Sequence, residues 1–339
     1  MFNFIPEFHD LPKAEKMPYN QLGQTDLHIS KLSLGAGPFG NVYGQVNEDI
    51  SREVIEYALR SGVNYIDTAY WYGQGVSETV LGKSLATIPR NAYFIGTKVG
   101  RYEKDYEKMF DFRAEKVLSS VDQSLQRLQL PYVDLIQIHD VEFAPSEDIL
   151  LSETLPALQQ VVARGKARYI GVTGYPVSAL KSLVEKSSVK IDAILSYCRA
   201  SIIDRTLDDY LPFFQEKGVG VLNAAATAMG LLTSQGPQSW HPGSDETKQQ
   251  CAQAVAYCAD NGVSVSRLAL WESLQSSGVC STLAGAHSIR VLKENLSAVT
   301  EPLTDKEMQC LKHLRLMFGD RRNHWEGVEL DRYRTAIKN

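Results

Sequence analysis

The sequence lacks the stretches that would mark a membrane, secreted or nucleic-acid-binding protein. No apolar run approaches the roughly 18 residues that a membrane-spanning helix needs. The N-terminus has no basic start followed by an apolar core, as a secretory signal would have. The chain of 339 residues has a formal net charge of -5 and no long basic run that could hold phosphates. We therefore expect a cytoplasmic protein with neither a membrane nor a nucleic acid as its partner.

Cysteine is scarce, and its spacing excludes the usual disulfide and metal patterns. The five cysteines are odd in number, and no two of them form a CxxC pair. Cys251 and Cys258 lie seven residues apart, which puts both on one face of a predicted helix. The pattern predicts buried free thiols in a reducing cytosol, rather than disulfides or zinc ligands. The cysteines are Cys198, Cys251, Cys258, Cys280 and Cys310.

Short apolar runs alternate with amphipathic segments along most of the chain. One such segment, 113–128, places Val117, Val121 and Leu125 on a single stripe, as an α-helix would. Strands that alternate with helices pair in parallel through crossover helices. Eight such units favour a closed (β/α)8 TIM barrel, an α/β fold, over an open sheet. The predicted strands are 31–35, 64–68, 93–98, 133–139, 167–173, 191–197, 219–224 and 281–285.

No shift in composition marks a domain boundary within this repeat. We predict a loose N-terminal arm at 1–17, the barrel at 18–318 and a C-terminal tail at 319–339. A predicted hairpin at 19–29 precedes the first strand and could plug the barrel floor. The tail either folds over the pocket as a specificity loop, or it is disordered or docks elsewhere.

The segment 35–40 matches the glycine pattern G-x-G-x-x-G of dinucleotide-binding folds. That fingerprint must open a helix, so that the pyrophosphate meets the helix N-terminus. Pro38 lies inside the motif, and the next helix is predicted to begin only near Asp49. The segment therefore does not fit the fingerprint. We predict instead that its glycines allow a close backbone approach in the first βα loop.

Four polar residues fall at or just after the ends of consecutive predicted strands. Asp67 ends the second strand and Tyr72 follows in its loop, while Lys98 and His139 end the third and fourth. In an α/β barrel the active site lies at this end of the strands. Each residue alone has an ordinary explanation, such as a helix cap for Asp67 or a hydrogen-bonded core position for His139. Together they indicate a shared site.

These residue types suit proton transfer to a carbonyl or alcohol oxygen. A tyrosine phenol has a pKa of about 10 and needs help to exchange protons near neutral pH. A nearby ammonium lowers that pKa, and an aspartate holds the ammonium charged and in place. A histidine can hydrogen-bond the substrate oxygen. With a hydride donor or acceptor beside it, the set predicts a carbonyl–alcohol oxidoreductase.

With these residues, the chain resembles the aldo-keto reductase superfamily over about residues 19–298. The resemblance implies that Tyr72 is the general acid/base, assisted by Lys98 and Asp67, and that His139 orients the substrate. It also implies a nicotinamide cofactor, extended across the barrel rim, with direct hydride transfer and no metal. The matching stretches are 67–69, 72–73, 77–78, 81–82, 97–98, 133–135 with His139, 165–166, 170–172, 230–232 and 294–295.

The resemblance also implies where the cofactor binds. A glycine turn leads to Ser288, which would cap a helix whose N-terminus favours phosphate, although a plain strand-to-helix turn would look the same. Positions 294 and 295 match those that hold the adenine, and positions 173 and 196 lie near the nicotinamide. The implied cofactor-binding residues are Thr173, Ser196, Ala224, Gly285, His287, Ser288, Glu294 and Asn295.

Three positions depart from the pattern of many family members. Gly174 replaces an asparagine, and the Ala224 and Ala226 pair replaces an aromatic residue or serine followed by a proline. Val291 replaces the arginine that NADP-preferring members often carry, and we expect the neighbouring Arg290 to point elsewhere. NAD is therefore favoured over NADP. His287 and Lys293 keep both nucleotides open.

Further stretches narrow the resemblance within the superfamily: 98–102, 194–198, 228–233, 236–237 and 240–242. With them, the sequence most resembles sugar dehydrogenases that act on L-galactose, L-fucose or D-arabinose. This implies oxidation of an aldose at C1 to a lactone, with Trp71 either stacking on the sugar or packing in the pocket wall. An NADPH-dependent reductase of aldehydes or ketones is the alternative activity. A cofactor-binding regulatory subunit is an alternative of another class. The oligomeric state is left open by the sequence.

Overall fold

A closed barrel of parallel strands forms the centre of the protein in a computed structural model that describes residues 4–45 and 47–338. Around the barrel the strands follow the order β10, β3, β4, β5, β6, β7, β8, β9, and each neighbouring pair is parallel. The predicted (β/α)8 barrel is therefore confirmed. The strands are β3 (Leu32–Gly35), β4 (Tyr65–Asp67), β5 (Phe94–Val99), β6 (Val133–Ile138), β7 (Ala167–Gly174), β8 (Ala193–Tyr197), β9 (Gly220–Ala224) and β10 (Ser281–Gly285).

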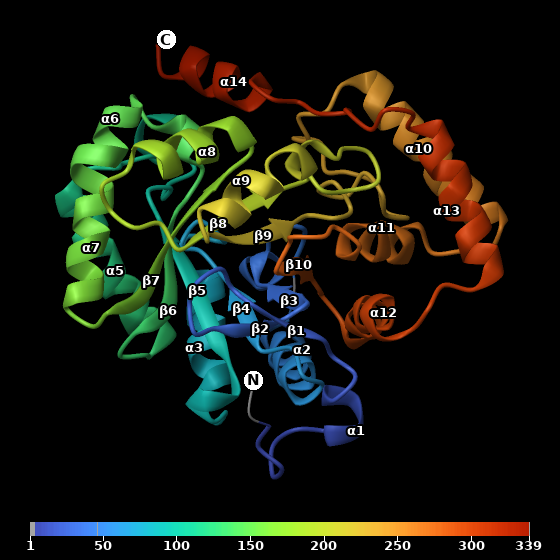
Figure 1. The fold of residues 1–339 in the computed structure, drawn as a ribbon, viewed down its shortest axis with the longest axis horizontal. Coiled ribbons are helices and arrows are strands. Elements are labelled where there is room, and N and C mark those ends of the chain that lie inside the picture. The colour runs from blue at the N-terminus through green and yellow to red at the C-terminus, as the bar shows by residue number, and fades with distance from the viewer. Residues whose placement is uncertain (1–3, 46, 339) are drawn as a thin grey trace.

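Helices surround the barrel and cover the outer faces of its strands (Figure 1). Their apolar stripes pack on the sheet, as Val117, Val121 and Leu125 do in the helix over 114–128. The helices that follow the strands are α2 (Glu48–Arg60), α3 (Val76–Leu85), α5 (Ala114–Leu128), α6 (Glu147–Ile149) with α7 (Leu155–Ala163), α8 (Val177–Lys186), α9 (Leu211–Glu216), α11 (Val265–Leu274) and α12 (Ile289–Thr300). The others are α1 (Leu11–Ala14), α4 (Tyr106–Met109), α10 (Asp245–Asp260), α13 (Asp305–Met317) and α14 (Val328–Ala336).

Two connections between strands carry additional helical turns. The loop after β5 contains the short helix α4. After β6, α6 and α7 are joined by a π-helical turn at Leu150–Thr154. Pro156 has no N–H to donate and would clash with an α-helical turn before it. The wider π turn keeps the chain helical up to this proline.

The predicted hairpin closes the floor of the barrel. Strands β1 (Tyr19–Gln21) and β2 (His28–Ser30) pair antiparallel, and Leu22, Leu27 and Ile29 are fully buried. They pack against inward-facing barrel residues, including Leu135 and Leu222. In Figure 1 the hairpin lies below the barrel strands, whereas α14 lies above them. Because the hairpin plugs one end, ligands reach the barrel from the other end.

The N-terminal arm is packed rather than loose where the structure describes it. Phe8 and Met17 are buried in the main hydrophobic core. The Arg60 guanidinium donates to the Phe8 carbonyl at 2.7 Å, so α2 also holds the arm. Residues 1–3, which belong to the predicted arm, lie outside the described residues.

The C-terminal tail folds back across the carboxyl ends of the strands. Trp325 is 3% exposed and stacks on Tyr175, with ring centroids 5.1 Å apart and an interplanar angle of 16°. Glu326 pairs with the buried Arg199 at 2.9 Å. These contacts place α14 over the open end of the barrel, where Glu329 and Tyr333 line its cavity.

The cysteines are free thiols, as predicted, and four of them are buried. Cys280 is partly exposed. In the described part of the chain, no helix combines the length and apolar character that crossing a membrane would require.

Candidate active site

Three neighbouring strands bring the predicted polar residues together. Asp67 is the last residue of β4, Lys98 lies near the end of β5, and His139 follows β6 directly. The Lys98 ammonium forms an ion pair with Asp67, and both side chains are nearly inaccessible to solvent. It also donates to the Thr68 carbonyl at 2.9 Å and to the Tyr72 hydroxyl at 3.4 Å. The structure thus places all four predicted side chains at one end of the barrel.

Two glycines hold the Tyr72 loop against the first βα loop. A Cβ atom at Gly40 would lie 2.2 Å from the Tyr72 carbonyl oxygen, and one at Gly73 would lie 2.5 Å from the Gly40 carbonyl oxygen. Gly73 also has φ of 72°, which side-chain-bearing residues rarely adopt. The glycine motif at 35–40 therefore serves close backbone approach, as predicted, and Gly37–Gly40 forms a 3-10 turn rather than the start of a long helix.

The phenol of Tyr72 is a weaker acid than the sequence interpretation suggested. Its removal from water raises the pKa of Tyr72, Lys98 lowers it and Asp67 raises it, and the net shift is upward. Burial disfavours the Lys98 ammonium, but Asp67 and Tyr72 stabilise it further, so the pKa of Lys98 also lies above its ordinary value. The resting site therefore holds a neutral phenol beside a charged ammonium.

His139 is a neutral imidazole in this site. Burial lowers the pKa of His139 to about 3, and the opposing effect of Asp140 does not restore it. Its ring meets Tyr72 edge to face at a centroid distance of 6.0 Å, and its Nδ1 atom is buried without a hydrogen-bond partner among the described residues. A neutral imidazole can donate one hydrogen bond to an oxygen held beside Tyr72.

A cavity of about 1200 Å³ opens above these residues. This exceeds the roughly 300–1000 Å³ of a typical small-molecule site, so the cavity has room for more than one small ligand. Two predicted residues are not on its wall. Ser196 is fully buried, and the Ser288 hydroxyl caps α12 by accepting from the Val291 N–H at 3.4 Å. The predicted residues on the wall are Asp67, Trp71, Tyr72, Lys98, His139, Thr173, Ala224, Gly285, His287, Glu294 and Asn295.

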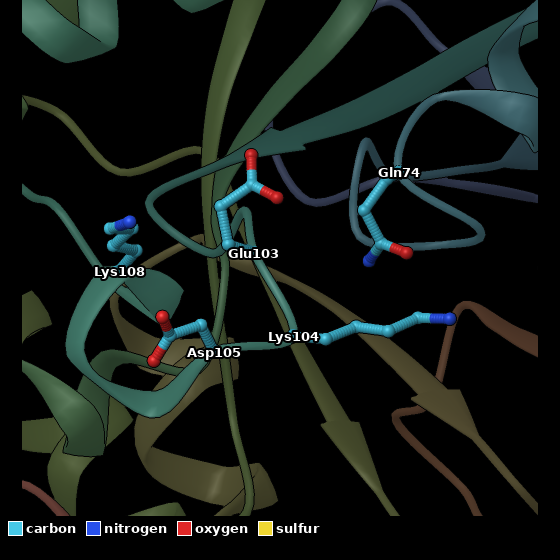
Figure 2. A pocket seen from close by; sticks show the side chains of 5 residues that line it. All are labelled: Gln74, Glu103, Lys104, Asp105 and Lys108. Atoms are coloured by element: carbon cyan, nitrogen blue, oxygen red, sulfur yellow. The ribbon is translucent and has the colours of Figure 1, made fainter.

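A second hollow of about 550 Å³ adjoins the cavity on the loop after β5. It shares Gln74 and Lys104 with the cavity wall. Figure 2 shows that the side chains of Glu103, Lys104 and Lys108 point in different directions rather than converging on one point. This hollow therefore forms an open, charged margin of the larger site.

The geometry of strand ends, ion pair and cavity agrees with a comparison against known families. The family model described as Aldo/keto reductase family matches residues 31–315. The chain belongs to the aldo/keto reductase family. This confirms the resemblance drawn from the sequence, and it makes the protein an oxidoreductase. Enzymes of this family use a nicotinamide nucleotide and act on small aldehydes or sugars.

Individual relatives of this aldo/keto reductase include sugar dehydrogenases. The chain is 44% identical over 289 residues to L-galactose dehydrogenase of Arabidopsis thaliana, covering 84% of this chain and 89% of the relative. It is 35% identical over 254 residues to D-arabinose 1-dehydrogenase of Saccharomyces cerevisiae, covering 71% and 74%. An aldo-keto reductase of Bacillus halodurans, solved in its holo form, aligns with a TM-score of 0.71 at 31% identity, over 88% of this chain and 96% of that one.

The cavity wall around α12 suits a nicotinamide nucleotide. Helix α12 begins directly after its N-cap, Ser288. Backbone N–H groups at the N-terminus of a helix attract phosphate. Asn295 donates to the Gly285 carbonyl at 3.1 Å, and Glu294 accepts from Ser264, the cap of α11. These bonds tie the turn after β10 to the two helices. The cavity that holds Tyr72 and Lys98 therefore has a hydrogen-bonded wall that attracts anions. Such a wall fits the phosphates of a nicotinamide nucleotide.

A guanidinium is present on the cavity wall beside Val291. Arg290 and Val291 both line the cavity, and the arginine is exposed. The first turn of α12 lies along the cavity wall, so adjacent residues on it can both face the ligand. The argument for NAD used the absence of a guanidinium here, and that argument no longer separates NAD from NADP.

The absence of an asparagine at position 174 has a steric explanation. A Cβ atom at Gly174 would lie 2.8 Å from the Glu142 Oε2 atom, so Glu142 occupies the space of a side chain there. The Tyr175 N–H donates to the other carboxyl oxygen at 3.0 Å. Burial, together with Asp140, raises the pKa of Glu142 to about 8. At neutral pH this is mainly a neutral carboxyl group, which offers one donor and one acceptor.

The sequence interpretation missed several side chains on the cavity wall. Arg101 and Asp140 come shortly after β5 and β6, and Tyr197 is the last residue of β8. All three are polar residues at or shortly after the end of a strand. The same pattern identified His139 in the sequence and could have identified them. No such signal existed for Tyr333, because the fold alone decides which face α14 covers.

Proposed function

We propose that this aldo/keto reductase oxidises an aldose at C1 to the lactone, with NAD or NADP as the oxidant. The observation that carries the proposal is the buried Asp67–Lys98 ion pair against Tyr72, with neutral His139 facing it across the cavity floor. The two sugar dehydrogenases among the relatives support the choice of an aldose. Polar wall residues beyond the reacting centre support a polyhydroxylated substrate.

The side chains would share the work of removing one proton and positioning one oxygen. The C1 hydroxyl of the sugar gives its proton to the ionised Tyr72 oxygen as the C1–H bond breaks. A bound nicotinamide nucleotide would supply the acceptor for the hydride that leaves C1. Lys98 stabilises the phenolate, and Asp67 keeps Lys98 in place. Neutral His139 donates a hydrogen bond to the same substrate oxygen and orients it.

Reduction of an aldehyde or ketone with NADPH is the second candidate function. It is favoured by the neutral resting form of Tyr72, which is the form that gives a proton to a carbonyl oxygen. Arg290 on the cavity wall also offers a partner for the 2′-phosphate that distinguishes NADP from NAD. The two functions share one set of side chains and differ in direction and substrate.

A spectrophotometric screen separates these functions. The full-length protein is assayed at 340 nm with NAD and NADP against L-galactose, L-fucose and D-arabinose, and with NADH and NADPH against simple aldehydes. We expect turnover with at least one aldose. Reduction of aldehydes without oxidation of any aldose would replace the first function by the second. Nucleotide binding without any turnover would support a regulatory subunit instead.

Sugar oxidation is expected to accelerate with pH. The pKa of Tyr72 is raised, so the phenolate that accepts the proton is a minor species at pH 7. Its fraction, and hence kcat/KM for the aldose, should rise about tenfold per pH unit below that pKa. His139, with a pKa of about 3, should add no inflection between pH 5 and 7. Rates are measured from pH 5 to 9, with thermal stability as control; a plateau from pH 7 upward would contradict the assignment.

Arg290 is expected to govern the use of NADP. Arg290→Ala should raise the Kd for NADP at least about tenfold, because a charge-assisted hydrogen bond to the 2′-phosphate is lost. The Kd for NAD should change by less than about twofold. Lys306→Ala, an exposed position in α13 outside the cavity wall, is the matched control. Equal changes for both nucleotides in Arg290→Ala would remove the residue from this role.

A further inference from the structure

Arg101 and Asp140 form a charged pair on the cavity wall beside the proposed reacting centre. The Arg101 Nη1 donates to the Asp140 Oδ2 at 2.6 Å, and the two side chains are 19% and 4% exposed. Asp140 follows His139 in the chain, and its Oδ2 lies 3.7 Å from the His139 Nε2. This distance is too long for a hydrogen bond. The pair therefore lies beside the imidazole without bonding to its Nε2 atom.

The backbone conformation of Asp140 directs its carboxylate toward Arg101. Asp140 has φ of 53°, a left-handed conformation that costs free energy for a residue with a side chain. Its N–H donates to the Thr173 hydroxyl at 3.1 Å, which fixes the turn after β6. Backbone strain of this kind persists only where the surrounding structure demands it. Here it turns the carboxylate from the strand end toward Arg101 and the cavity.

The guanidinium of Arg101 has hydrogen-bonding capacity to spare. Its Nη1 donates to Asp140, and its Nη2 has the Met109 sulfur, at 3.9 Å, as its hydrogen-bond acceptor among the described residues. The Phe110 and Phe143 rings, with centroids 5.3 and 5.9 Å from Cζ, also lie beside the guanidinium, but they offer no oxygen or nitrogen acceptor. The Arg101 Nε is buried without a hydrogen-bond partner in the same part of the chain. The guanidinium lies over the Trp71 ring, with the Arg101 Cζ atom 4.1 Å from the ring centroid. This cation–π contact fixes the position of the guanidinium relative to the indole. A nearly enclosed cation with few acceptors predicts that a ligand supplies more.

We infer that Arg101 and Asp140, held by Trp71, recognise hydroxyl groups of a polyhydroxylated substrate beyond its reacting carbon. This rests on the proposed aldose oxidation. A hydroxyl group both donates and accepts, so it can bridge the carboxylate and the guanidinium. A simple aldehyde offers one oxygen, and Tyr72 and His139 would hold that atom. The charged pair therefore selects sugars over small carbonyl compounds by the hydroxyls that it binds.

The wild-type enzyme provides the first test. Using saturating nucleotide, kcat/KM is measured for the best aldose and for each of its monodeoxy analogues. Removing a recognised hydroxyl leaves buried charges without their partner, which is a costly mismatch. We expect one deoxy analogue, altered beyond C1, to lose about 30-fold or more in kcat/KM. Equal kcat/KM for all analogues would overturn the inference while leaving aldose oxidation in place.

Two variants then link that hydroxyl to the pair. In Asp140→Asn and Arg101→Lys, the penalty for the same deoxy analogue should shrink to about threefold or less, because the parent sugar has lost the same contact. Arg101→Lys keeps the charge beside Asp140, so it tests recognition even if Asp140→Asn folds poorly. Asp49→Asn, in an exposed pair with Arg52 outside the cavity wall, is the matched control and should keep the wild-type penalty.

The outcomes separate the inference from the proposed function. Penalties that are unchanged in both variants would make Arg101 and Asp140 structural and overturn the inference. Loss of kcat alone, equal for parent and deoxy sugars, would mean that the pair only positions His139, and this also overturns it. If the wild-type enzyme oxidises no aldose, the proposed function fails in the first assay and the inference falls with it.

Discussion

Replacing Tyr72 with phenylalanine is expected to lower kcat by about 10²–10⁴-fold, the usual contribution of a general acid or base. The ring would remain against His139, with only the hydroxyl oxygen missing. Lys98 would keep its bonds to Asp67 and the Thr68 carbonyl, so the ion pair beneath the ring should stay intact. The Kd for the nucleotide, followed by tryptophan fluorescence, should change by less than about twofold.

The matched control for this experiment is Tyr70→Phe. Tyr70 precedes Tyr72, but its hydroxyl donates to Glu103 at 3.4 Å and it does not line the large cavity. The variant removes the same atom from the same loop, which joins β4 to α3, and it should leave kcat nearly unchanged. Retention of more than about a tenth of the wild-type kcat in Tyr72→Phe would reject the assigned proton transfer.

The barrel could be predicted because its signals are local and repeated. Alternating apolar runs and amphipathic segments give parallel strands with crossover helices, whatever the details of packing. The hairpin at the floor was also readable, since its turn separates two apolar stretches that end buried, as Leu22 and Leu27 do. The packed N-terminal arm was not readable, because Phe8 is held by Arg60, a partner more than 50 residues away.

The site could be predicted only as far as strand ends determine it. Asp67, Lys98 and His139 meet because consecutive strands of a barrel end at one rim. The place of Arg290 on the cavity wall could not be predicted, because the rotation of α12 against the cavity depends on its tertiary packing. The Arg101–Asp140 pair was missed for a related reason, since its meaning lies in a contact between two loops rather than in either loop alone.

The direction of the pKa shift of Tyr72 could not be predicted from the types of the neighbouring residues. A lysine beside a tyrosine suggests a lowered pKa, and Lys98 does pull in that direction. The loss of water around the phenol is the larger effect, and Asp67 adds to it. Only the structure gives the burial that decides the sign. The residues proposed from the sequence stay the same, but the pKa of Tyr72 is shifted upward rather than downward.

Lys98→Met is expected to damage both stability and turnover. The variant leaves the Asp67 carboxylate buried, with the Gln137 amide at 2.7 Å and the Tyr65 hydroxyl at 3.4 Å as its remaining side-chain donors among the described residues. Breaking a buried ion pair by removing one partner costs about 3–5 kcal/mol in the free energy of unfolding. Turnover should fall by at least about 100-fold, because Tyr72 loses the ammonium that stabilises its phenolate. Urea unfolding and steady-state kinetics measure the two effects separately.

A double variant separates the two roles of the lysine. Lys98→Met combined with Asp67→Asn removes both charges, and the carbonyl oxygen of the introduced amide could still accept from Gln137. Most of the unfolding free energy should return, while turnover should stay low. Lys83→Met, which breaks an exposed pair with Glu48, is the matched control and should cost at most about 1 kcal/mol. If the double variant regained turnover, the ammonium would be needed only to neutralise Asp67, and its role beside Tyr72 would have to be withdrawn.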